Sequence, residues 1–184
     1  MKSLQLAFQL VKNFLNDRVE HDLRISTIRQ PSTQTCWATC YKMVDAWNQN
    51  PQSICYYVSL QTKECGHCEA PEDNCNKSRR TAQVLSDWRA LGYSGTRHYP
   101  KPLTLTEIRN AHKKRRPIQI FYVPPGRRIN DGHFALISGT SRCWNADPAL
   151  LISDPASSKR KPAEFEYSNF RDSVSWSESW VVVK

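Results

Sequence analysis

The chain has 184 residues, of which 39% are hydrophobic and 23% charged, and this balance is typical of one folded domain and excludes a disordered chain. Its 26 lysine and arginine residues against 17 aspartate and glutamate residues give a formal net charge of +9. No apolar run reaches the roughly 18 residues that a membrane-spanning helix requires, so we expect a soluble protein.

The positive charge favours an acidic partner, an anionic membrane surface or nucleic acid, unless it is simply a solvated surface. No homeodomain, zinc-finger or RNA-recognition pattern organises the basic residues, so the sequence contains no specific nucleic-acid motif. The basic residues cluster at 79–80, 113–116, 127–128 and 159–161.

The first residues of the chain have an amphipathic pattern. Leu4, Phe8, Val11 and Leu15 recur at helical spacing, while glutamines and a lysine interrupt the apolar run and no small-residue cleavage site follows. We therefore predict an amphipathic helix within residues 1–23, which packs on the domain or on a partner. Without a signal peptide, we expect a cytoplasmic protein or one exported by a specialised secretion system.

A single domain is predicted over residues 24–184, and its first half is helical. Residues 24–28 alternate like a short strand, and a helix is expected over 34–48 with Ser32 or Thr33 as its N-cap. Residues 81–91 predict a second helix, which Gly92 ends.

A third helix begins with a capping box made by Thr104 and Glu107, and it ends before Pro117. Strands follow at 118–123, 133–138, 149–153 and 180–183, with turns between neighbours. Helices first and strands later predict an α+β fold, with a helical N-terminal part packed on a C-terminal antiparallel sheet.

Cys36 is the candidate nucleophile, because it falls in the first turn of the helix predicted over 34–48. Unpaired backbone N–H groups and the helix dipole stabilise a thiolate at this position. His133 begins a strand directly after Gly132, and Asp154 ends the next strand. If these strands pair as a hairpin, the carboxylate can orient the imidazole beside the thiol.

These residues resemble the motifs of papain-like cysteine peptidases. Gln30 lies six positions before Cys36, and Cys36-Trp37-Ala38 is similar to the nucleophile segment of that family. Residues 132–139 are similar to its histidine strand, and residues 151–155 are similar to the strand that carries its third catalytic group. The compact length is similar to bacterial effector proteases of plant pathogens and to leader peptidases of bacteriocin exporters. The resemblance in order and pattern extends over about 25–183.

The resemblance implies a role for each residue. Cys36 would be the nucleophile, His133 the base, Asp154 the group that orients the imidazole, and Gln30 a donor to the oxyanion. It implies no cofactor for catalysis. Asp154 stands where papain has asparagine, and Thr33 where papain-type enzymes carry a cysteine. The Asn-Ser-Trp signature of papain is absent, and Asp147, which also precedes a proline, is the second candidate for the third position.

Four of the seven cysteines crowd into a polar insert at about 52–77: Cys55, Cys65, Cys68 and Cys75. The spacing of Cys65 and Cys68 is that of half a zinc site, and disulfides within the insert are an equal alternative. The insert would hold a structural zinc ion or cross-links, without a part in catalysis.

We therefore expect a cysteine protease that hydrolyses a protein or peptide substrate through a thioester, as a bacterial effector or toxin. The same three residues also serve a thiol-dependent deamidase or acyltransferase. A non-catalytic, basic, zinc-stapled binding module and a self-processing domain are further alternatives.

Overall fold

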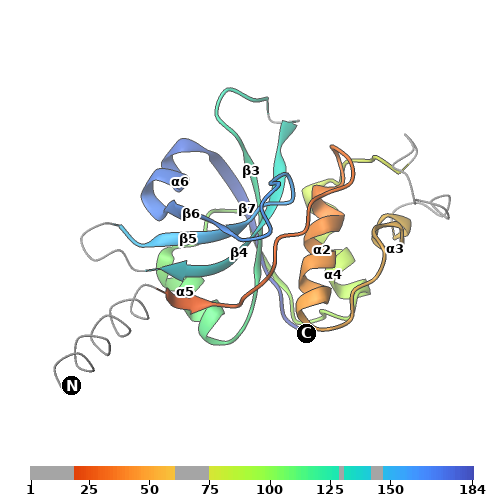
Figure 1. The fold of residues 1–184 in the computed structure, drawn as a ribbon, viewed down its shortest axis with the longest axis horizontal. Coiled ribbons are helices and arrows are strands. Elements are labelled where there is room, and N and C mark those ends of the chain that lie inside the picture. The colour runs from red at the N-terminus through yellow and green to blue at the C-terminus, as the bar shows by residue number, and fades with distance from the viewer. Residues whose placement is uncertain (1–18, 61–74, 129–130, 142–146) are drawn as a thin grey trace, which may run out of the picture.

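The computed structural model describes residues 19–60, 75–128, 131–141 and 147–184 (Figure 1). In chain order the elements are β1 (Val19–Asp22), α2 (Cys36–Trp47), α3 (Ile54–Ser59), α4 (Thr81–Ala90), β2 (Arg97–Tyr99), α5 (Leu105–Lys113), β3 (Ile118–Val123), β4 (His133–Ser141), β5 (Ala149–Ser153), β6 (Ala163–Glu166), α6 (Tyr167–Ser173) and β7 (Ser175–Val181). No helix within these ranges is long and apolar enough to cross a membrane.

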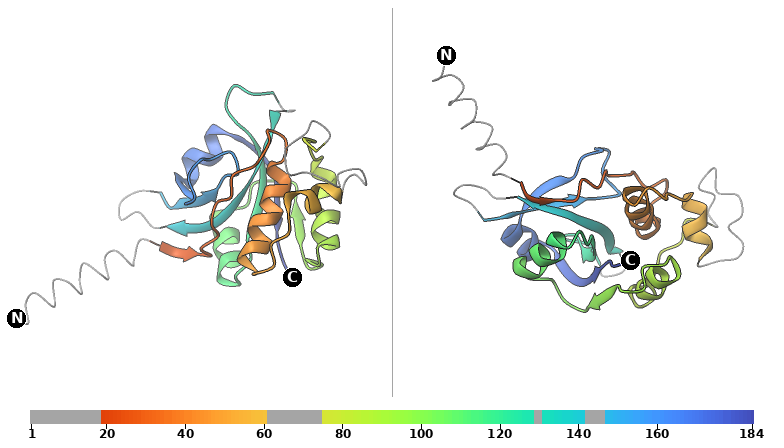
Figure 2. Two further views of the ribbon diagram at one scale, coloured as in Figure 1. Left: turned by 45° about the vertical axis from the view of Figure 1, so that its right-hand side comes forward. Right: turned by 90° about the horizontal axis from the view of Figure 1, so that it is seen from below.

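A seven-stranded antiparallel sheet forms the centre of the molecule, in the order β2-β7-β3-β4-β5-β6. β1 pairs with the end of β4 that lies farthest from His133, because Val19 is opposite Ser141. Helices α2, α3 and α4 lie to one side of the sheet, and α5 and α6 lie on its other side (Figures 1 and 2). The fold is α+β, as the sequence predicts.

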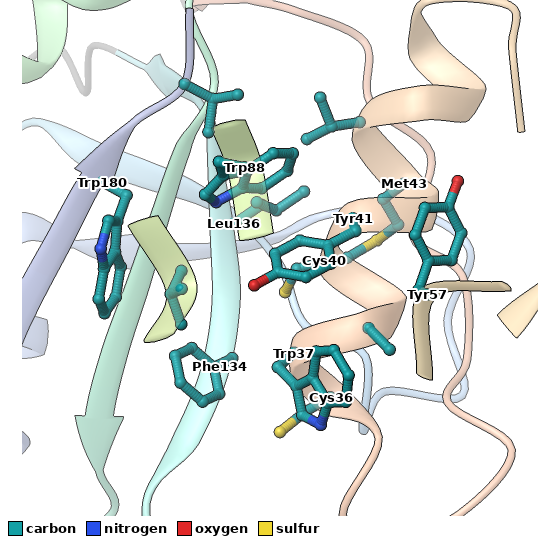
Figure 3. Packing of buried hydrophobic residues seen from close by; sticks show 14 of the residues in the cluster. Cys36, Trp37, Cys40, Tyr41, Met43, Tyr57, Trp88, Phe134, Leu136 and Trp180 are labelled. Carbon is teal, nitrogen blue, oxygen red and sulfur yellow. The ribbon is translucent and has the colours of Figure 1, made fainter. Parts of the chain in front are cut away.

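Both faces of the sheet are buried, which explains why β3 and β4 read as continuous apolar runs rather than as alternating ones. On one face, Phe134 and Leu136 pack with Trp37, Tyr41 and Trp88 of α2 and α4 (Figure 3). Their immediate neighbours along β4 belong to a second cluster under α5 and α6. The two clusters hold β4 between helical layers and fix the position at which His133 begins.

Buried carboxylates attach α2 to the helices beside it. Asp45 of α2 accepts hydrogen bonds from the hydroxyls of Tyr57, at 2.7 Å, and Tyr93, at 2.5 Å. Asp87 of α4 forms a buried ion pair of 2.5 Å with Arg79. Because each carboxylate has close donors, these polar groups can be buried without a large desolvation penalty.

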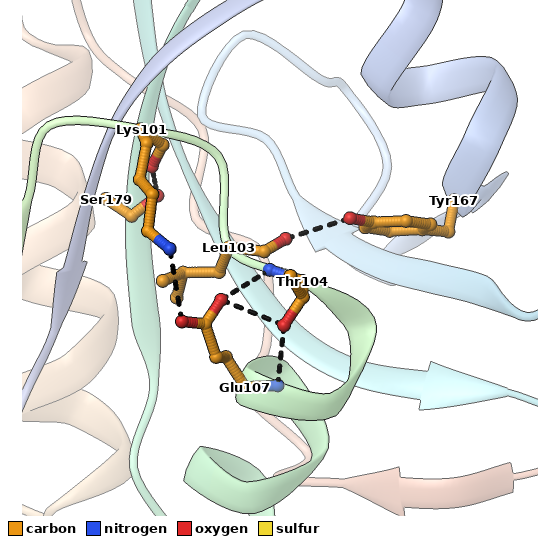
Figure 4. Close-up of polar contacts among 6 residues, drawn as sticks. All are labelled: Lys101, Leu103, Thr104, Glu107, Tyr167 and Ser179. Atoms are coloured by element: carbon orange, nitrogen blue, oxygen red, sulfur yellow. Dashed lines mark hydrogen bonds and ion pairs between the residues drawn. The ribbon is translucent and has the colours of Figure 1, made fainter.

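The capping box predicted at the third helix is confirmed at the start of α5. The Thr104 hydroxyl accepts from the backbone N–H of Glu107, and the Glu107 carboxylate accepts from the Thr104 N–H at 2.7 Å (Figure 4). The adjacent carbonyl of Leu103 accepts from the Tyr167 hydroxyl of α6 at 3.0 Å. The cap therefore joins the two helices that cover this face of the sheet.

Three local predictions were wrong. Residues 19–22, within the helix predicted over 1–23, form strand β1; the rest of that prediction lies outside the described residues. Residues 24–28 are not a strand: Thr27 N–H bonds to Arg160 O of the β5–β6 loop at 2.9 Å, and Arg24 N–H bonds to the side chain of Asp22. The N-cap of α2 is Thr35, without a side-chain cap bond, and not Ser32 or Thr33.

Candidate active site

Cys36 is the first residue of α2, and its side chain is 6% exposed. Figure 3 shows its sulfur on the side of α2 that faces β4. As a first-turn residue, Cys36 has a backbone N–H outside the helical hydrogen-bond ladder, and it lies at the positive end of the helix dipole. The site thus provides both a thiol and an unoccupied N–H donor next to it.

His133 and Asp154 meet at the end of the sheet next to this helix start. His133 is the first residue of β4, and Asp154 follows directly after β5. Because these two strands are antiparallel neighbours, the start of one lies beside the end of the other. The Nε2 atom of His133 lies 2.6 Å from Oδ1 of Asp154.

The imidazole also interacts with the Cys36 thiol, and this interaction favours the protonated ring. Since Nε2 faces Asp154, the nitrogen left for Cys36 is Nδ1. Burial alone would lower the pKa of His133, but the hydrogen bonds with Asp154 and Cys36 and their negative charges raise it to about 10. The imidazole therefore holds a proton across neutral pH, between a carboxylate and a thiol.

Asp154 is held by three donors. Besides the imidazole, its Oδ1 accepts from the backbone N–H of Ala156 at 2.7 Å, and its Oδ2 accepts from the Tyr122 hydroxyl at 3.3 Å. Burial acts to raise the pKa of this carboxyl, but its hydrogen bonds, with that of His133 the largest, lower it below its usual value. Asp154 is therefore an ionised and fixed partner of the imidazole.

Tyr122 is a member of this site that the sequence did not reveal. It lies directly opposite His133 in the β3–β4 pairing, with its ring edge-on to the imidazole at 5.7 Å between centroids. Its side chain is buried, and the neighbouring Asp154 raises its pKa further beyond the effect of burial. Only the strand register could have identified it, because the loop between the strands is too long to fix that register from sequence.

We predict that, in the Tyr122→Phe variant, the fall in the rate of Cys36 alkylation on acidification begins at a higher pH. The change deletes the hydroxyl that donates to Asp154, so the pKa of Asp154 rises and the imidazolium loses its anionic partner earlier during acidification. The alkylation rate at pH 5 should fall about 2- to 10-fold, which corresponds to part of the free energy of a hydrogen bond to a charged group. Tyr57→Phe, which deletes a hydroxyl from the Asp45 pair, is the matched control. Equal shifts in both variants would contradict the prediction.

Gln30 lies near the same end of the sheet. Its backbone N–H donates to the carbonyl of Pro155, the residue after Asp154, at 2.9 Å. The Oε1 atom of its side chain is buried and has no hydrogen-bond partner within the described part of the chain. Because the oxygen of this side-chain amide has no hydrogen-bond partner there, a ligand can orient the amide.

Gly132 allows a side chain to pack closely on the backbone just before His133. A Cβ atom at this position would lie 2.0 Å from Cζ of Phe121. The Phe121 ring therefore packs directly on the backbone that leads into His133. Any side chain here would displace either that ring or the start of β4.

Other sequence candidates lie elsewhere. Asp147 is exposed at the opposite end of β5 from Asp154 and bonds with Ser168, so the structure favours Asp154. Cys40, one turn after Cys36, is fully buried, and burial raises the pKa of its thiol. Trp37 is a core residue whose indole donates to the Lys77 carbonyl at 2.9 Å.

The cysteine-rich insert is described in part. Cys65 and Cys68 lie outside the described residues, as does Cys143. Cys55 is half-buried and Cys75 is buried, and neither is in a disulfide with another described cysteine. Within the described ranges, no cluster of three metal-ligating side chains occurs. Zinc or disulfide cross-linking of the insert stays a prediction.

Comparisons with known proteins identify the family and the fold. The model of the family described as papain-like cysteine protease AvrRpt2 matches residues 18–174. Among solved structures, the peptidase domain of Streptococcus ComA, a bifunctional ABC transporter of a quorum-sensing pathway, has a TM-score of 0.60 at 16% identity, over 87% of this chain and 98% of that one. A double-glycine motif protease of an AMS/PCAT transporter, solved with its leader peptide, has a TM-score of 0.53 at 16% identity, over 89% and 94%. No curated relative matches by sequence.

Proposed function

The chain belongs to the papain-like cysteine proteases of the AvrRpt2 family, and from this premise we propose that Cys36, His133 and Asp154 are its catalytic triad. The observation that carries the proposal is the position of His133, which is hydrogen-bonded to Asp154 through Nε2 and also interacts with the Cys36 thiol. A buried histidine with both partners is what an activated thiol nucleophile requires.

In the acylation step, the Cys36 sulfur attacks the carbonyl carbon of the scissile peptide bond. The negative charge that develops on the carbonyl oxygen is stabilised by the free N–H of Cys36 and by the amide of Gln30, each donor being worth about 2.7–4 kcal/mol. The protonated His133 then gives its proton to the departing amine, and a thioester remains on Cys36.

In the deacylation step, neutral His133 takes a proton from a water molecule that attacks the thioester. The sulfur departs as the thiolate beside the protonated imidazole, and the carboxylic acid product leaves and loses its proton to water. Asp154 stays ionised throughout and stabilises the imidazolium form. Thiol, imidazole, carboxylate and water complete the cycle, so the reaction requires no metal or cofactor. Zinc or disulfides in the insert would be structural.

We propose a protein or peptide as the substrate. One structural neighbour was solved with a leader peptide, which supports an extended peptide as the ligand of this fold. The resemblance to compact effector proteases supports a role as an effector or toxin. Deamidation and acyl transfer use the same thioester and differ only in the bond attacked or in the acceptor, so the products distinguish them.

A proteome-derived peptide library tests this function. The protein is incubated with the library, and new amino termini are identified by mass spectrometry, with protein pre-alkylated at Cys36 as the control. We expect cleavage at a restricted set of sites, absent after alkylation. Mass gains of one unit at glutamine without new termini would instead identify a deamidase. Cleavage that survives alkylation of Cys36 would exclude the proposed triad.

A further inference from the structure

Three loops surround the end of the sheet at which Cys36 and His133 meet. They are the segment 23–35 that enters α2, the described parts of the β3–β4 loop at 124–128 and 131–132, and the β5–β6 loop at 154–162. Backbone hydrogen bonds join the first to the third, from Thr27 N–H to Arg160 O and from Gln30 N–H to Pro155 O, both at 2.9 Å. Figure 1 shows the segment 23–35 running past the sheet into the start of α2.

These loops carry a set of cationic side chains, which we call the basic rim: Arg29, Arg127, Arg128, Lys159, Arg160 and Lys161. All six are exposed. Within the described part of the chain, none of their side chains is in an ion pair or a hydrogen bond. Their charges are therefore not neutralised by the fold.

The acidic residues of the same loops are already occupied. Asp154 is bound to His133, and Asp131 accepts from the backbone N–H of Arg128 at 3.3 Å. The dipole of α2 adds positive potential at the same place, since its N-terminus lies at the thiol. The loops that lead into Cys36 and His133, and the loop that begins at Asp154, thus carry unpaired positive charge within the described residues.

We propose that the basic rim selects acidic peptides, so that the peptidase prefers substrates with aspartate or glutamate flanking the scissile bond. The proposal rests on the proposed function, because the rim matters to catalysis only if Cys36 cleaves polypeptide. A polypeptide is the occupant that we favour, since the loops that carry these charges lead into Cys36 and His133 or begin at Asp154. Such a field raises the association rate of an oppositely charged ligand, and salt screens it.

Two alkylating reagents of different charge distinguish the effect of the basic rim from the effect of the proposed triad. Iodoacetamide is neutral and iodoacetate is anionic, and both attack the same thiol. The rate of Cys36 modification by iodoacetamide reports the activated thiol, while the ratio of iodoacetate to iodoacetamide reports the local potential. Both rates are measured at one pH, by peptide mapping, at 20 mM and 500 mM NaCl.

Lys159→Glu/Lys161→Glu reverses two rim charges and leaves the catalytic residues unchanged. Lys113→Glu/Lys114→Glu makes the same change of net charge near the start of β3, whereas the site lies at the end of that strand. We expect the rim variant to lower the reagent ratio about 3- to 10-fold at low salt and the control variant to leave it nearly unchanged. High salt should remove the difference.

An equal ratio in the wild-type protein and both variants would overturn the proposal, and so would an equal fall in both variants. Slow, unselective reaction of Cys36 with iodoacetamide would instead overturn the proposed function, and the substrate preference with it. In the peptide library, cleaved sites should be enriched in aspartate and glutamate within about four residues, and the rim variant should lose that enrichment. Anionic vesicles that bind without affecting peptide preference would assign the rim to membranes instead.

Discussion

Replacement of His133 by alanine is expected to slow the alkylation of Cys36 by iodoacetamide at pH 5.5 about 10³-fold. His133 interacts with Cys36 and its pKa is raised to about 10, and a cation beside a thiol favours the reactive ionised form. Without it, Cys36 becomes similar to an ordinary thiol, of which only about one part in 10³ is ionised at this pH. The measurement is the pseudo-first-order rate of Cys36 modification, resolved by peptide mapping.

His98→Ala is the matched control for this experiment. His98 also pairs with a carboxylate, Glu178, and stacks on Trp180 at 5.2 Å between centroids, but it lies on the edge strand β2. Its loss should leave the reactivity of Cys36 within about twofold. If the two histidine variants react alike, the Cys36–His133 pair does not activate the thiol.

The alkaline limit follows from the same imidazole. The pKa of His133 is raised from 6.5 to about 10, so the His133–Asp154 interaction contributes stability that is full below pH about 6.5 and is lost as pH rises through about 10. Release of the amine needs the protonated imidazole, so hydrolysis should fall over the same upper range. A hydrolysis rate of the wild-type protein that already falls near pH 7 would contradict this prediction.

Replacement of Cys36 by alanine is expected to reduce peptide cleavage about 10⁴- to 10⁶-fold, because it removes the atom that forms the acyl bond. The thiol is small and near the surface of the core, so the free energy of unfolding should change by less than about 1.5 kcal/mol. Cleavage is measured as the rate of product appearance for a site identified in the peptide library.

Cys40→Ala provides the control within the same helix. Cys40 follows Cys36 by one turn and is fully buried, with its sulfur among core residues (Figure 3). Its loss should cost stability through packing while the cleavage rate stays within a few-fold of wild type. Retained activity in the Cys36 variant, or complete loss in the Cys40 variant, would transfer the nucleophilic role away from Cys36.

Local sequence patterns predicted the elements that carry a clear signal within their own residues. The capping box located α5, the apolar spacing located α2 and α4, and the continuous apolar runs located β3 and β4. The short strands β1, β2 and β6 were missed, because strands of three or four residues carry little pattern and depend on distant partners. Residues 24–28 alternate, yet they form no strand, and Thr27 N–H bonds to a loop residue, Arg160.

The site was predictable where it depended on element ends. A helix start and two strand ends placed Cys36, His133 and Asp154, since antiparallel neighbours bring opposite termini together. Tyr122 was not predictable, because its contact with Asp154 follows from which residue of β3 lies opposite His133. Register depends on the whole sheet and not on any segment read alone.

Strand β4 also fixes the distance between His133, at its first residue, and the place where β1 joins the sheet. It spans nine residues from His133 to Ser141, about 27 Å in extended form, and β1 enters the sheet at its far end. Whatever is joined to the chain ahead of Val19 is therefore tethered one full strand away from the nucleophile. An affinity tag placed there would leave the thiol open to reagents, whereas a tag inserted near Arg29 would cover it. For a protein delivered or purified as a fusion, the amino end is the side to use.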